Sequence, residues 1–187
     1  ALGGLTGVRS AGMLCSVIRA KLIAMWIGPA GVGLNALLTN ALDVLSQLSQ
    51  AAIRVSAVRS IAATDDGRER TGLITALLRW ALWLGSGGAV LTMLLSPLLS
   101  LLTFGDYSYS WMFVVLAVAV LASALSVGRS AALQGIGELK RLATLTVTAV
   151  IISTLLAIPL FYFFRLKSIV WVVTLFAVVQ AAVFYID

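Results

Sequence analysis

The chain has 187 residues, of which 61% are hydrophobic and 11% are charged, and its formal net charge is +6. Soluble domains average about 45 to 50% apolar and about 25% charged residues, so this composition excludes an ordinary soluble domain and indicates an integral membrane protein. A single cysteine, Cys15, and the lack of histidine exclude an internal disulfide framework and argue against a zinc site.

Six apolar stretches predict an all-α membrane protein with six transmembrane helices. The uncharged runs at 80–105, 107–128, 142–164 and 168–186 each reach or approach the ~20 residues that span a bilayer as a helix. The predicted spans cover residues 5–27, 34–61, 71–102, 111–133, 142–164 and 168–187.

The connections between the spans follow from glycine, proline and charge. The cluster GPAGVG at 28–33 predicts a tight turn between the first two spans. The second span is longer than a perpendicular crossing requires, so we expect its last turns to project beyond the hydrocarbon. The charged sequence TDDGRER at 64–70 predicts the next loop, and TFGDYSYS at 103–110 predicts a short polar turn.

The later spans carry their own signals. Pro97 predicts a bend in the third span, because proline lacks an amide donor. The glycines of that span, Gly85, Gly87 and Gly88, predict close helix contact, with a flexing hinge as the alternative. The sequence QGIGELKR at 134–141 predicts a turn, and FYFF at 161–164 resembles an interfacial aromatic belt.

Orientation follows from the basic residues near the ends of the spans. One side has eight: Arg9, Arg59, Arg68, Arg70, Arg79, Arg129, Lys140 and Arg141. The other side has two, Arg165 and Lys167. The excess predicts that the N-terminus and, after six spans, the C-terminus are both cytoplasmic.

A polar stripe runs along the second span. Its members step by three or four residues and are Asn35, Thr39, Asn40, Asp43, Ser46, Gln47, Gln50 and Arg54. On a helix they share one face, which predicts the wall of a polar cavity. The alternative is that these side chains only bond to neighbouring helices.

Four charged residues lie within the first two spans: Arg19, Lys21, Asp43 and Arg54. Arg19 and Asp43 lie at a similar distance from the glycine turn, roughly 14 Å at ~1.5 Å per residue, which predicts an ion pair between adjacent helices. Lys21 and Arg54 would then supply net positive charge. The roles of Arg19 and Lys21 are exchangeable, and a purely architectural pair is the other alternative.

No catalytic constellation emerges from the residue types. The sequence offers no general-base pair, metal-ligand set or phosphate-binding motif. We therefore expect no enzyme activity and no cofactor, and no nucleic-acid partner, because the basic residues form no exposed patch.

Two segments carry a family resemblance. KLIAMWIGPAGVGL at 21–34 resembles the first turn of bacterial polysaccharide flippases of the O-antigen type, and ALQGIGELKRLA at 132–143 resembles their turn between spans four and five. These flippases belong to the superfamily that also holds multidrug and toxin extruders and lipid II flippases. The resemblance covers the whole chain in span order, but only the N-terminal half of a typical member.

The resemblance implies one six-helix lobe of a two-lobe exporter in the bacterial cytoplasmic membrane. It implies flipping of undecaprenyl-pyrophosphate-linked oligosaccharide, with Arg19, Lys21 and Arg54 as candidates for binding the pyrophosphate. The expected partners are this lipid-linked glycan, membrane lipids and a second lobe that the chain lacks. The alternatives are a multidrug or cation antiporter of the same fold and a membrane scaffold without transport.

Overall fold

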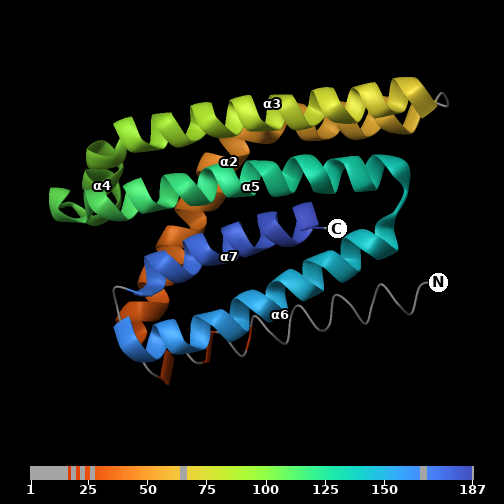
Figure 1. The fold of residues 1–187 in the computed structure, drawn as a ribbon. Coiled ribbons are helices and arrows are strands. Elements are labelled where there is room, and N and C mark those ends of the chain that lie inside the picture. The colour runs from red at the N-terminus through yellow and green to blue at the C-terminus, as the bar shows by residue number, and fades with distance from the viewer. Residues whose placement is uncertain are drawn as a thin grey trace.

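The computed structural model describes residues 17, 20, 21, 24 and 25 and the ranges 28–63, 67–164 and 168–186. Every regular element in this part of the chain is a helix (Figure 1), as the sequence predicts. The elements are α2 (Pro29–Ala63), α3 (Gly67–Leu94), α4 (Ser96–Phe104), the 3-10 helix η1 (Tyr107–Tyr109), α5 (Ser110–Ile136), α6 (Leu139–Phe164) and α7 (Ser168–Ile186).

Four stretches of the described helices are long and apolar enough to cross a membrane. They are Thr71–Leu94, Tyr107–Ile136, Leu139–Leu160 and Ile169–Ile186, and they indicate a membrane protein. Helix α2 is not one of these four candidate spans, because polar residues recur at nearly every turn of it. The predicted span at 5–27 lies largely outside the described residues. The described residues therefore hold four candidate spans, whereas the sequence of the whole chain predicts six.

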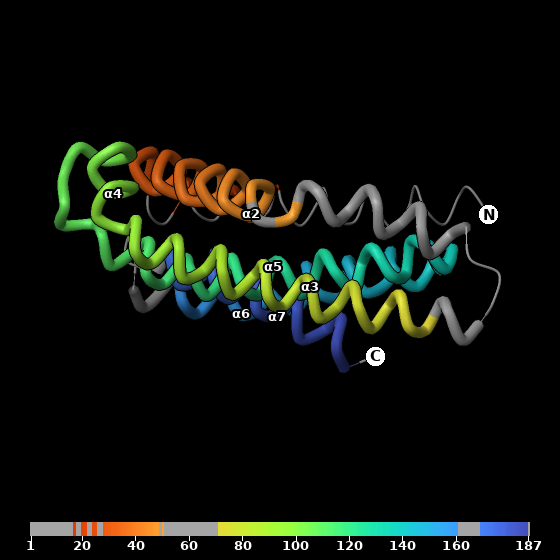
Figure 2. The backbone as a smooth tube through the Cα atoms, turned by 90° about the horizontal axis from the view of Figure 1, so that it is seen from above, coloured from red at the N-terminus to blue at the C-terminus, as the bar shows by residue number. Residues whose placement is uncertain are grey.

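Helix α5 is the centre of the bundle. It packs against α2, α3 and α7, and α6 packs mainly on α7 (Figure 1). Seen from above, α2 lies on one side of the layer that α3, α5, α6 and α7 form (Figure 2). More than half of the apolar window of α5 is buried, a larger share than in the other three candidate spans.

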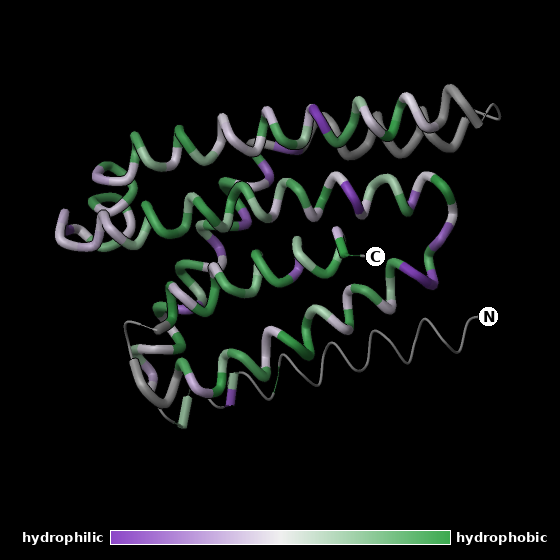
Figure 3. Tube along the Cα trace, in the orientation of Figure 1, coloured by the Kyte–Doolittle hydropathy of each residue, from purple (hydrophilic) through white to green (hydrophobic). Residues whose placement is uncertain are grey.

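The main core forms where α5 meets α2 and α7. Phe113 and Leu116 of α5 are fully buried, as are Leu38 of α2 and Ile169 of α7. Figure 3 shows α5, α6 and α7 as mostly hydrophobic, with hydrophilic segments along α2 and near the connection between α5 and α6. Burial of these side chains is worth about 1.5 to 3 kcal/mol each relative to exposure in water, although lipid reduces that gain.

The predicted third span, 71–102, is two helices. Helix α3 ends at Leu94, and α4 begins at Ser96 with Pro97 in its first turn. Because Pro97 has no N–H, it cannot bond to the preceding turn, and its ring clashes with the carbonyl there. The bend that the sequence predicts at Pro97 is therefore a break, and α4 turns away from α3 (Figure 1).

Two predicted loops are shorter than the sequence indicates. The backbone turns at Gly28, where φ is +84°, so α2 already begins at Pro29 and includes most of the glycine cluster. Likewise, Gly67–Arg70 of the charged sequence TDDGRER forms the first turn of α3. A left-handed φ suits glycine, which explains why one position suffices for the first turn.

The polar turn predicted at 103–110 is present but shorter, at 105–109. Gly105 ends α4 with φ of +71°, and the Asp106 carboxylate accepts a bond from the N–H of Ser108 at 3.2 Å. This bond from the backbone, with a further one from the Ser108 side chain, lowers the pKa of the Asp106 carboxyl below its ordinary value. The exposed carboxylate therefore orders the start of η1 and stays charged.

Small residues set the distance between α3 and α5. A Cβ atom on Gly85 would lie 2.6 Å from the Cβ of Ala124, and one on Gly128 would lie 2.8 Å from the Cβ of Ala81. The predicted close contact is thus confirmed at Gly85. It is wrong at Gly87, around which a Cβ would meet no atom within 4 Å.

Arg129 holds the end of α7 against α5. Its Nε donates to the carbonyl oxygen of Phe184 at 3.1 Å, and its guanidinium carbon lies 5.3 Å from the centre of the Tyr185 ring. A cation at the last carbonyls of a helix also complements the helix dipole. The sequence suggests only a topological role for Arg129, whereas the structure gives it a packing role.

Candidate functional site on helix α2

Helix α2 has an apolar face and a polar face. Leu38 and Leu42 are buried in the core cluster that includes α5 and α7, with Leu34 and Leu45 packed beside them. These four positions recur at intervals of three and four residues, so one side of the helix carries them all. The polar residues occupy an adjoining sector.

The predicted stripe divides into an exposed part and a part that faces the bundle. At about 100° per residue, the stripe is too broad to have one environment along its whole width. Asn40, Asp43 and Gln47 are exposed. Asn35, Thr39 and Ser46 are partly buried, and Gln50 is buried.

The exposed part forms a short polar row. Asn40, Asp43 and Gln47 lie within about 60° of one another around the helix axis, because they are three and four residues apart. Exposed apolar side chains flank the row, with Val44 at 56% and Leu48 at 79% exposure. We call Asn40, Asp43 and Gln47 the polar row. It presents two amides and one carboxylate to whatever covers this side of α2.

Ser46 bonds to the centre of the bundle. Its hydroxyl lies 2.8 Å from the hydroxyl of Ser123 on α5, which also donates to the carbonyl oxygen of Val120 at 2.8 Å. Ser46 therefore links α2 to α5. This agrees with the alternative interpretation of the stripe, in which its side chains hydrogen-bond to neighbouring helices.

Gln50 is buried without a partner for its amide nitrogen among the residues that the structure describes. It lies beside a cavity of about 10 Å³, at the lower limit of the space that one water molecule needs. The walls are apolar and small: Leu77, Ala81, Ala124, Val127, Gly128 and Ala131. The amide thus lies where α2, α3 and α5 meet.

Replacing Gln50 by leucine is expected to stabilise the protein. Leucine has a similar volume, and its side chain removes a buried donor whose unpaired state costs about 1 to 3 kcal/mol. Thermal unfolding in detergent should show a higher midpoint for Gln50→Leu and a lower one for Gln50→Glu. A lower midpoint for Gln50→Leu would mean that the amide is bonded in the protein.

The predicted cations are described only in part. Lys21 is exposed in a helical segment, whereas Arg19 and the side chain of Arg54 lie outside the described part of the chain. The predicted pair of Arg19 with Asp43 therefore also lies outside it. Asp43 itself is exposed on α2.

Comparisons with known proteins add no assignment. No protein-family model matches the chain, and neither the curated proteins nor the solved structures contain a match.

Proposed function

We propose that the chain is one lobe of a bacterial membrane transporter that flips undecaprenyl-pyrophosphate-linked oligosaccharide. The observation that carries this proposal is the polar row on α2, which is exposed on a helix that packs against three of the four apolar candidate spans. Polar groups that face lipid lose their bonds to water, so a row of them favours a hydrated path or a covering partner.

The chemistry of the row suits a glycan. Asn40 and Gln47 offer amide donors and acceptors, which sugar hydroxyls require. A pyrophosphate requires fixed cations, and Lys21 is an exposed cation within a helical segment. Arg19 and Arg54 are the further candidates from the family resemblance. In this proposal a second lobe covers the polar row and completes the path.

The orientation is part of the proposal. One end of the bundle carries a group of basic residues: Lys140 and Arg141, which follow the end of α5, and Arg79 and Arg129, which lie toward that same end. We place this end in the cytoplasm together with the chain termini. Asp106 marks the opposite end. In a background without Cys15, the variant Asp66→Cys should react with an impermeant reagent from the cytoplasmic side alone, and reaction from outside would reverse the orientation.

Apolar substitution of the polar row tests the function. In proteoliposomes that contain this lobe and its partner, the triple variant Asn40→Leu, Asp43→Leu, Gln47→Leu should flip lipid-linked pyrophosphate oligosaccharide at least about tenfold more slowly. A tenfold change corresponds to about 1.4 kcal/mol, a modest part of what three polar contacts supply. The thermal midpoint should stay equal or rise, since the row is exposed.

A matched control lies next to the row. Val44→Leu changes an exposed apolar neighbour, so it should leave flipping unchanged. Unchanged flipping in the triple variant would remove the row from the path.

The exposed carboxylate of Asp43 favours a second candidate, a cation antiporter, because embedded acids attract cationic substrates. Transport of cationic dyes without flipping of the pyrophosphate lipid would replace the flippase by this antiporter. Transport of neither substrate would favour the scaffold.

A further inference from the structure

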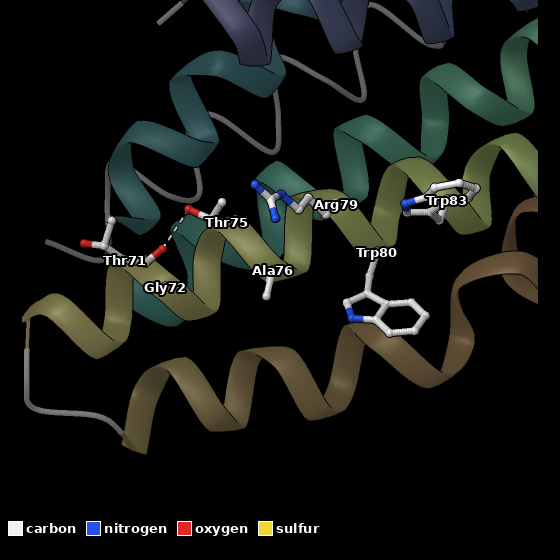
Figure 4. Close-up of a pocket in the computed structure, with 7 residues that line it drawn as sticks. All are labelled: Thr71, Gly72, Thr75, Ala76, Arg79, Trp80 and Trp83. Atoms are coloured by element: carbon white, nitrogen blue, oxygen red, sulfur yellow. Dashed lines mark hydrogen bonds between the residues drawn. The ribbon is translucent and has the colours of Figure 1, made fainter.

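A groove on α3 lies apart from the polar row. It has a volume of about 1050 Å³, and the described residues that line it all belong to one half of the α3 surface. They are Thr71, Gly72, Thr75, Ala76, Arg79, Trp80 and Trp83. Figure 4 shows Thr71, Thr75 and Arg79 on one side of α3, and Ala76 and Trp80 on the side toward α2.

The groove combines one cation with two indole rings. Trp80 is 62% exposed and Trp83 is 75% exposed, and Arg79 is exposed between the threonines and these rings. Thr75 already donates its hydroxyl to the carbonyl oxygen of Thr71 at 2.9 Å, so the guanidinium is the strongest free donor (Figure 4). An Arg beside exposed indoles suits a ligand with a phosphate at one end and apolar chains at the other.

The packing of α3 on α5 gives the depth of this groove. Gly85 lies against Ala124, and Ala81 lies against Gly128, so the two helices run antiparallel with a fixed register. Continuing that register places Arg79 level with Ser130, one residue beyond Arg129. Arg129 in turn bonds to the carbonyl oxygen of Phe184, two residues before the end of α7.

That level coincides with the edge of the hydrocarbon. Arg129 lies 19 positions after Ser110, the first residue of α5, which is a rise of roughly 28 Å at ~1.5 Å per residue. The hydrocarbon core of a bilayer is about 30 Å thick, and α5 has no charged side chain between these two residues. If Ser110 lies at one edge of the hydrocarbon, Arg79 lies near the head-group phosphates at the other edge, and Trp80 and Trp83 lie in the adjoining interfacial zone that tryptophan prefers.

We propose that the groove binds the head group of an anionic bilayer phospholipid. The phosphate pairs with the guanidinium of Arg79, and the upper acyl chains lie along Trp80 and Trp83. Charge complementarity supports this occupant, because the chain carries a net charge of +6 and Arg79 is the one charged side chain among the described residues that line the groove. The site is independent of the transported substrate, since it lies on α3 and uses none of the residues of the polar row.

The test measures which lipid quenches the groove tryptophans. The protein, with Trp26, Trp111 and Trp171 replaced by Phe, is placed in nanodiscs that contain brominated phosphatidylglycerol or brominated phosphatidylcholine. Quenching should show about a fivefold preference for phosphatidylglycerol, the effect of one basic side chain near the membrane surface. Arg79→Gln should abolish the preference, and Arg79→Lys should retain part of it.

The matched control is Arg141→Gln. Arg141 is another exposed basic residue, at 47% side-chain exposure, and it pairs with Glu138 at 3.2 Å outside the groove. Its replacement should leave the preference unchanged. If the Trp-to-Phe background fails to fold, native mass spectrometry of the otherwise unaltered chain and its Arg79→Gln variant measures the same lipid ratio.

Three outcomes would overturn the proposal. They are equal quenching by both lipids, a preference that survives Arg79→Gln, and loss of the preference when 10 mM inorganic phosphate is added, since that last result would assign the site to free anions.

Discussion

Gly85→Ala is expected to lower the free energy of unfolding by about 1 to 3 kcal/mol, the usual effect of overpacking a tight contact. The new methyl group would lie 2.6 Å from the Cβ of Ala124, which the backbone of α5 holds in place. Neither atom has a rotamer to change, so the two helices must separate. Thermal or denaturant unfolding of the protein in detergent measures the change.

Two further variants make this prediction specific. Gly87→Ala lies two residues away on the same helix and meets no atom within 4 Å, so its stability should stay equal or rise slightly, since alanine favours helix. Gly85→Ala combined with Ala124→Gly moves the methyl group from α5 to α3 and should recover most of the lost stability. A destabilised Gly87→Ala, or a double variant without recovery, would contradict the contact described above.

Arg129→Ala is expected to destabilise the protein by about 1.5 to 3 kcal/mol, the usual range for a hydrogen bond that involves a charged group. The change removes the donor to the Phe184 carbonyl oxygen and the cation that lies 5.3 Å from the Tyr185 ring centre. The loss is local, so amide hydrogen exchange should accelerate most in the last turn of α7.

Arg141→Ala is the control for charge alone. Its pair with Glu138 is nearly half exposed on both sides, and exposed pairs contribute about 0 to 1 kcal/mol. Arg129→Lys should lie between wild type and alanine, because lysine keeps the charge but loses the planar group that stacks on Tyr185. Equal effects of Arg129→Ala and Arg141→Ala would mean that the contact with α7 contributes little.

The apolar helices could be predicted from the sequence because charge and glycine mark their ends. The predicted spans 111–133 and 168–187 correspond to α5 at Ser110–Ile136 and α7 at Ser168–Ile186. In each case an uncharged run stops at a turn that polar groups or glycine specify, as at Gly137 with φ of +86°. Hydropathy together with these end signals therefore locates such helices.

Features that depend on neighbouring helices could not be predicted in this way. The stripe on α2 is periodic, but only the position of α5 decides that Ser46 reaches Ser123 while Asp43 stays exposed. Similarly, Gly85 and Gly87 look equivalent in sequence, and only the register against Ala124 separates them. The break at Leu95 could be predicted in part. Pro97 indicates where the helix is interrupted, but not that it ends there and a new helix begins.

The groove on α3 had a signal in the sequence that charge counting hides. Arg79, Trp80 and Trp83 recur at one and four residues, which places a cation and two indoles on one half of a helix.

Because α5 is central, several helices that pack together are not synthesised one directly after the other. The bond between Ser46 and Ser123 joins positions 77 residues apart, and the one between Arg129 and Phe184 joins positions 55 apart. When α2 leaves the ribosome, the helix that will cover its inward face has not yet been made. The buried side of α2, including Gln50, must therefore lie in another environment until α5 has been synthesised. The same holds for the side of α5 that packs against α7.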